Sequence, residues 1–306
     1  MASRVILKGF RLQLVVAVVS TALGPSPPRV AGLERVSAAW TPAGWRGGAP
    51  LDAAAAPLLG KAPLVFAGEV RQLRGLLAGA AGGDGVVLVA EDCSGGGAFA
   101  TDRVRDRVRA TRLTAIATCH ASGSPVVEVL AAPETTEAPE ACYRRAAMAT
   151  NLVRAFAAGG YGTAPADAGV AEALRFARAI GAGGAVDLAL ANRPIFTCRR
   201  VASLDYEEAL TRQDSTTGRW YGTSAHLLAV DGDAGGQVLE YARGLSNPFL
   251  VDVAGADAAA VAKTVAALDP LSEPGRVALS LSEPRPDADD LRAALGARPW
   301  VEAAAL

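Results

Sequence analysis

Short apolar runs alternate with longer amphipathic stretches over most of this chain, and this alternation limits the folds that it can adopt. The runs are bounded by turn residues and have the length of buried strands. They are 86–90, 125–129, 225–230, 248–253 and 276–281. The stretches between them are long enough for crossover helices, and they are 101–118, 141–158, 168–180, 237–245 and 257–268. The pattern therefore predicts an α/β fold with parallel strands, either a β/α barrel or an open doubly wound sheet.

Composition argues for a globular protein that does not bind nucleic acid. The 306 residues are 51% hydrophobic, which is enough for one large domain or two small ones. Thirty basic side chains nearly balance 31 acidic ones, and no basic block is interleaved with aromatic residues. We therefore expect no nucleic-acid partner.

The cysteines predict reduced thiols rather than a metal site. Positions 93, 119, 142 and 198 have no CxxC spacing, and only His120 and His226 could join them as soft ligands, so a zinc ribbon is not expected. Wide spacing favours free thiols in a cytoplasmic protein, although an even count also allows disulfides.

The N-terminal segment has two interpretations. Three basic residues precede the apolar stretch 12–23, in the order of a secretory signal, but the stretch is too short to span a membrane. Its β-branched residues, the sharp break at 24–28 and the lack of an A-x-A-like cleavage site favour a strand instead. We expect residues 1–39 to form an extension containing this strand, ahead of one domain over 40–306, with no membrane partner.

Several phrases carry a resemblance to a known family, and they occur in the same order as in that family. They are Trp-Thr-Pro-Ala-Gly-Trp-Arg at 40–46, Pro-Leu-Val-Phe-Ala-Gly-Glu at 63–69, Glu-Asp-Cys at 91–93, Asn-Leu-Val-Arg-Ala-Phe at 151–156, Leu-Asp-Tyr-Glu-Glu-Ala-Leu at 204–210, Thr-Ser-Ala-His at 223–226, Asn-Pro at 247–248, Leu-Asp-Pro at 268–270 and Pro-Gly-Arg at 274–276. On these phrases the chain resembles the class II (plant-type) 3-deoxy-D-arabino-heptulosonate-7-phosphate (DAHP) synthases. The resemblance implies a TIM-type (β/α)8 barrel with its active site at the carboxyl ends of the strands.

Most of the positions that carry chemistry in that family differ here. The family joins phosphoenolpyruvate to erythrose 4-phosphate, using a divalent metal held by Cys, His, Glu and Asp. The metal cysteine survives as Cys93, but the basic stretch that follows the second strand is replaced by the acidic segment 133–140. Asp252 stands where the family has a lysine, 198–200 replaces Ser-His-Glu, and 231–233 replaces a Glu-Arg pair. Because two phosphates around a divalent ion need cations, the resemblance implies a divergent member without the metal, without another cofactor and without the parent reaction.

The resemblance also implies a barrel shortened at its C-terminus. Residues 298–302 match the seventh strand, and no eighth follows. An open barrel would expose a hydrophobic edge. We therefore expect a strand within 5–19, or a second subunit, to fill the gap.

The remaining polar residues suggest covalent chemistry. Cys93 is the best candidate nucleophile, forming a thioester with an acyl group before transfer to an amine or alcohol. His226 or His120 would be the base. The alternative is that Cys93 is a packed relic and His226 is structural. The residues expected to bind substrate are Arg199, Arg200 and Asp92.

Two functions remain open. The first is an enzyme of secondary metabolism, a transferase that forms an amide, ester or carbon–carbon bond from a small-molecule or carrier-bound acyl substrate. The second is a non-catalytic binding or scaffold subunit that associates with a partner enzyme or a second copy. A third reading, a fragment completed by a separately encoded protein, conflicts with the missing lysine and arginine positions.

Overall fold

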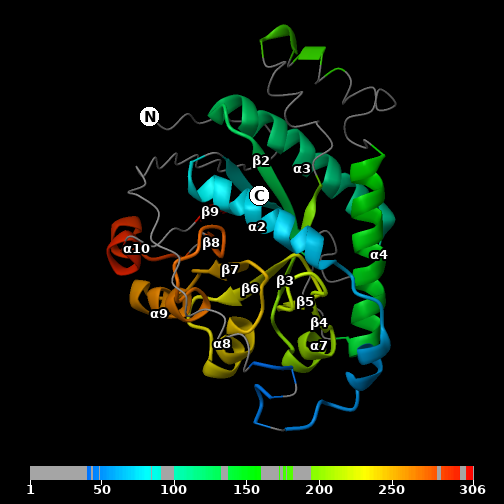
Figure 1. Ribbon diagram of the computed structural model, residues 1–306. Helices are drawn as coiled ribbons and strands as arrows, with labels where there is room; N and C mark the ends of the chain where they lie inside the picture. Colours follow the sequence, from blue (N-terminus) through cyan, green and yellow to red (C-terminus); the bar gives the residue numbers. More distant parts are fainter. Residues whose placement is uncertain are drawn as a thin grey trace.

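The structure is a computed structural model, and its described part is a parallel β-barrel surrounded by helices (Figure 1). The described residues are 40–42, 44–47, 49–83, 85–90, 100–131, 137–159, 172, 175–176, 178–181, 194–280, 284–296 and 301–305. Within them, no helix combines the length and apolar character needed to cross a bilayer.

Seven parallel strands form the barrel. They are β1 (Val86–Ala90), β2 (Val126–Ala131), β3 (Phe196–Arg200), β6 (Leu227–Asp231), β7 (Phe249–Asp252), β8 (Val277–Ser280) and β9 (Val301–Ala305). Each strand pairs with the next in chain order. The TIM-type fold is confirmed, and all five apolar runs are strands.

The ring closes between its first and last strands, so the expected gap is absent. In the closing pair, Val87 lies opposite Ala303 and Val89 opposite Ala305. Because β9 uses one edge on β8 and the other on β1, no open edge is left there for an eighth strand. The strand expected within 5–19 lies outside the described residues, but the described barrel does not need it for closure.

Helices cover the outside and the amino end of the barrel, and the chain order is largely that of a repeated strand and helix. They are η1 (Ala56–Gly60), α2 (Ala67–Ala81), α3 (Thr101–Ser122), α4 (Pro139–Ala158), α7 (Leu204–Ala209), α8 (Gly236–Arg243), α9 (Ala258–Leu268) and α10 (Ala288–Leu295). A hairpin of β4 (Thr211–Gln213) and β5 (Trp220–Gly222) follows α7. Four of the five predicted helices are confirmed, while most of 168–180 lies outside the described residues.

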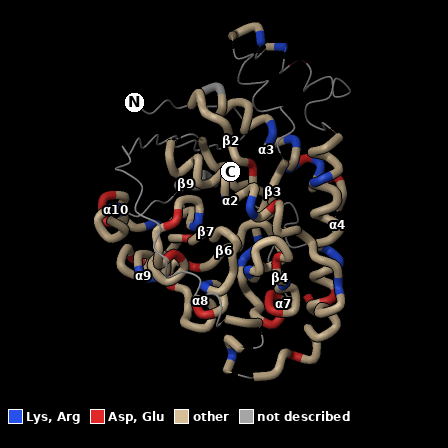
Figure 2. The backbone as a smooth tube through the Cα atoms, viewed as in Figure 1, with Lys and Arg blue, Asp and Glu red and all other residues tan. Residues whose placement is uncertain are grey.

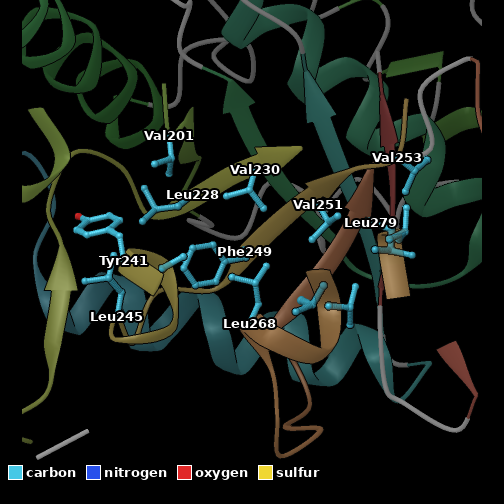
Figure 3. Close-up of a cluster of buried hydrophobic side chains, with 14 of the residues drawn as sticks. Val201, Leu228, Val230, Tyr241, Leu245, Phe249, Val251, Val253, Leu268 and Leu279 are labelled. Atoms are coloured by element: carbon cyan, nitrogen blue, oxygen red, sulfur yellow. The ribbon is translucent and has the colours of Figure 1, made fainter. Parts of the chain in front are cut away.

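Side-chain alternation along the strands separates a core in the lumen from clusters outside the barrel. The strand residues of the lumen core are Val87, Val89, Val127, Val129, Phe196, Cys198, Leu227, Ala229, Leu250 and Ala278. The largest outer cluster of the described residues lies between β6 to β8 and the helices α8 to α10, where Tyr241, Phe249 and Leu268 pack together (Figure 3). Successive strand residues point to opposite faces, so a residue's position decides which core it joins.

Helix α2 closes the amino end of the lumen. Its Leu73 and Leu77 are fully buried against the lumen core. Gly275, in the loop before β8, has a φ of 75° and lies so close to α2 that a Cβ would be 2.4 Å from the carbonyl oxygen of Arg74. Only glycine fits this position, because both the backbone angle and the space exclude a side chain.

Candidate functional site

Three charged side chains meet where β3, β6 and β7 end. Alternation aims Arg200, Asp231 and Asp252 at the lumen, in line with the lumen residues two positions earlier on each strand. The Arg200 guanidinium donates to Asp231, and its Nη2 lies 2.7 Å from Asp252 Oδ2. The two aspartates are register partners on neighbouring strands. We call these three residues the mouth triad.

The mouth triad has one more negative than positive charge. Its side chains are partly open to solvent, at 31% for Arg200, 62% for Asp231 and 20% for Asp252. Around the rest of the barrel, acidic and basic positions are interspersed (Figure 2). Arg200, predicted to bind substrate, does lie at the mouth, but its guanidinium is engaged by two carboxylates.

Arg199 faces the other way, toward the helices, because it is the next residue along the strand. Its Nε lies 3.2 Å from Glu207, an Nη2 hydrogen bond of 2.9 Å reaches Cys142 Sγ, and the guanidinium stacks 4.4 Å from the Tyr206 ring. Burial raises the pKa of Glu207, although the charge of Arg199 opposes the shift. Arg199 therefore links β3 to α4 and α7, and the structure does not bring it to the mouth.

His226 lies at the amino end of the strands. It immediately precedes β6 and is 3% exposed. Its Nδ1 accepts a 2.9 Å hydrogen bond from the Thr197 backbone N–H, and its Nε2 lies 3.7 Å from Glu69. A five-residue strand spans about 16 Å, so this ring is separated by the length of β6 from the mouth.

His120 also lies at the amino end of the barrel. It falls in the last turn of α3, which leaves the carboxyl end of β1 and returns to the amino end of β2. A helix of 22 residues extends about 33 Å. Of its side chain nothing is described.

The predicted pairing of Cys93 with a histidine is not tested by the described residues. Cys93 and Asp92 lie outside the described residues, but the segment that carries them starts from Ala90, at the carboxyl end of β1. Parallel strands place that end opposite both histidines. In such a barrel, a residue that follows a strand lies at the carboxyl end, whereas a residue at the end of a helix lies at the amino end. The distance between two residues in the sequence does not show this.

The divalent metal that the resembling family uses would need several His, Cys, Asp or Glu ligands. Among the described residues, no three His, Cys, Asp or Glu side chains gather as a metal site. The two mouth carboxylates already accept hydrogen bonds from the Arg200 guanidinium. Absence of the metal from the whole protein stays a prediction, because Cys93 is outside the described part.

Asp231 and Asp252 were recognised in the sequence only as replacements for family residues. What the sequence did not reveal is that they would share one arginine. The signal was present in their place at the last position of two lumen-facing strands.

Several family-like phrases form the scaffold instead of the mouth. Arg154 on α4 holds both carboxylate oxygens of Glu69 at 2.8 Å. Asn247 bridges the backbone of Gly222, and the buried guanidinium of Arg276 donates to the carbonyl oxygens of Leu268 and Asn247. Burial lowers the pKa of Arg276 to about 9. These phrases therefore preserve the packing of the amino end.

The fold and mouth define a class of protein, a parallel β/α barrel with a polar site at the carboxyl ends of its strands. The model of the class-II DAHP synthetase family matches residues 164–295. A phospho-2-dehydro-3-deoxyheptonate aldolase of Streptomyces coelicolor is 29% identical over 292 residues, covering 74% of this chain and 64% of the relative. The chain is therefore similar to the class II DAHP synthases over part of its length.

A second relative matches a shorter region. It is a probable chloroplastic phospho-2-dehydro-3-deoxyheptonate aldolase of Catharanthus roseus, 35% identical over 92 residues, which cover 29% of this chain and 19% of the relative. The chain thus spans less than two thirds of the length of either curated relative.

Proposed function

We propose that this chain is a cytoplasmic transferase of secondary metabolism that no longer condenses phosphoenolpyruvate with erythrose 4-phosphate. The observation that carries this proposal is the mouth triad. Phosphoenolpyruvate brings a phosphate and a carboxylate, and both need cationic partners. In the described mouth the single cation is already shared by Asp231 and Asp252, so an incoming dianion would meet a net negative charge.

The proposed reaction is acyl transfer through Cys93. The thiolate attacks the acyl carbon of a small-molecule or carrier-bound thioester and expels the donor thiolate, which leaves an acyl group on Cys93. An amine or alcohol then attacks this thioester, loses a proton to a base and displaces the Cys93 thiolate. No metal or organic cofactor takes part.

Asp231 is the base that we propose in place of a histidine. It is the most exposed member of the mouth triad and lies at the carboxyl end, from which His226 is separated by the length of β6. A carboxylate there also favours an amine acceptor, because it attracts the ammonium form before deprotonation.

Intact mass spectrometry tests the covalent step. The purified chain is incubated with a panel of acyl thioesters, and we expect one donor to add the mass of its acyl group. Cys93→Ser should abolish the adduct, whereas Cys119→Ala, at a buried position on α3, should retain it. An adduct that persists in Cys93→Ser, or no adduct from any donor, would contradict acyl transfer through this thiol.

A non-catalytic binding subunit is the second candidate function. The locked state of Arg200 and the placement of both histidines at the opposite end favour it. In that case the partner is an enzyme or a second copy of this chain. Cys93→Ala would then leave the activity of the partner complex unchanged, while the transferase proposal requires turnover to be lost with folding intact.

A further inference from the structure

The imidazole of His226 provides an additional hydrogen bond between β3 and the start of β6. The first backbone ladder pair of these strands is Cys198 with Leu227. One position earlier, the His226 backbone N–H donates to the Thr197 carbonyl oxygen at 3.1 Å. The Thr197 N–H has no backbone partner opposite it and donates instead to His226 Nδ1 at 2.9 Å. The side chain thus replaces a backbone carbonyl oxygen as the acceptor where β3 and β6 begin to pair. We call the paired edges of these two strands the β3–β6 seam.

This hydrogen bond fixes the protonation state of the ring. A backbone N–H can only donate, so Nδ1 must present a lone pair. The neutral ring then carries its proton on Nε2, which points toward Glu69 Oε1 at 3.7 Å. Phe196 packs edge-on against the ring with centroids 5.2 Å apart.

We propose that His226 is a proton-operated latch, which holds the amino end of the β3–β6 seam closed when neutral and releases the Thr197 amide when protonated. A proton on Nδ1 would face the Thr197 N–H, so that hydrogen bond is lost. The Thr197 hydroxyl, also 2.9 Å from Nδ1, can then accept from the new N–H and hold the ring in place. The seam opens locally while the side chain stays inside.

The charged groups around the ring belong to two helices. Glu69 on α2 favours the protonated ring, and Arg154 on α4 opposes it. Burial is the largest influence and lowers the pKa of His226 from its ordinary 6.5. Because the folded-state pKa is lowered, the unfolded chain takes up the proton first, and the stabilising contribution is lost as pH falls below about 6.5.

The sequence makes the test clean, since the chain has two histidines in all. Hydrogen exchange followed by mass spectrometry is run on the full chain at pH 7 and pH 5. We expect protection of the peptides covering β3 and β6 to fall about tenfold or more after correction for intrinsic exchange, because the unfolded chain takes up the proton first. His226→Asn, whose Oδ1 takes the place of Nδ1 and cannot be protonated, should reduce the change to about twofold or less.

Two variants serve as controls. His120→Asn should respond to pH like the wild type. Thr197→Val keeps the backbone N–H but removes the hydroxyl that would accept from protonated Nδ1, so its seam should respond to acid more steeply. Equal pH responses in wild type and His226→Asn would overturn the proposal.

A direct reading of the ring covers the case in which His226→Asn does not fold. Nitrogen-15 shifts of the wild-type histidines at pH 7.5 should show one ring as the Nε2–H tautomer. If the buried ring is instead the Nδ1–H tautomer or an imidazolium at that pH, the latch does not exist.

Discussion

Arg112 on α3 and Glu128 on β2 form a buried ion pair on the outer face of the barrel, with side chains 5% and 1% exposed. Removing one partner takes this contact away from a charge that stays buried. We expect Arg112→Met to lower the free energy of unfolding by about 3–5 kcal/mol in urea titrations. The double variant Arg112→Met with Glu128→Leu should recover much of the loss, because no buried charge remains. If the double variant loses as much as the sum of both single variants, the pair itself is the stabilising element.

The close contact between Gly244 and Trp40 leads to a second prediction about stability. A Cβ on Gly244 would lie 2.0 Å from Cδ2 of the Trp40 indole, which is itself 5% exposed. Gly244→Ala should therefore displace the indole, destabilise the chain by about 1–3 kcal/mol and shift the tryptophan fluorescence to longer wavelength. Gly236→Ala is the matched control, because its Cβ would meet no atom within 4 Å. Unchanged fluorescence in Gly244→Ala would show that the close contact is absent.

Charge reversal at the mouth should create an anion site. The double variant Asp231→Asn with Asp252→Asn changes the mouth triad from one net negative charge to one net positive charge and removes the two carboxylates that hold Arg200. We expect calorimetry to detect inorganic phosphate or phosphoenolpyruvate binding about tenfold tighter than in the wild type, which corresponds to about 1.4 kcal/mol. Asp233→Asn, at an exposed position beyond the strand end, should have little effect. Tight phosphoenolpyruvate binding by the wild type would contradict the proposed change of function.

We expect the titration of Glu69 to cause a further loss of stability in acid. Burial raises its pKa, but the neighbouring His226, a hydrogen bond from the Phe66 backbone N–H and the charge of Arg154 outweigh burial and hold the pKa at about 2. A lowered carboxyl pKa stabilises the fold above the unfolded value of 4.5, and this stabilisation is lost as pH falls from 4.5 toward 2. With part of the side chain in solvent, the contribution is on the order of 2 kcal/mol.

Urea unfolding at several pH values measures this contribution. Glu69→Gln should be less stable than the wild type at pH 6, and the difference should shrink as pH approaches 2. Because His226 and Glu69 affect each other's pKa, the same comparison is repeated in the His226→Asn background. A constant difference between wild type and Glu69→Gln across this range would exclude a titrating ion pair with Arg154.

Local patterns in the sequence determined most of the barrel. The apolar runs at 86–90, 225–230 and 276–281 needed no knowledge of their neighbours, because a strand buried on both faces is apolar throughout. β3 was not predicted from such a run, since Arg199 and Arg200 interrupt it. The carboxylate partners lie on different sides of the strand: Glu207 on the following helix α7 for Arg199, and Asp231 and Asp252 on β6 and β7 for Arg200.

What only the tertiary structure decided is which residues share an end of the barrel. The sequence identified His226, His120 and Arg200 as polar residues with chemical potential. It could not state that both histidines lie at the amino ends, or that Arg200 is neutralised at the mouth, because these facts depend on the direction of parallel strands and the alternation of side chains across them. Closure by β9 on β1 is likewise a property of the complete ring, since no single strand encodes how many neighbours will fit around it.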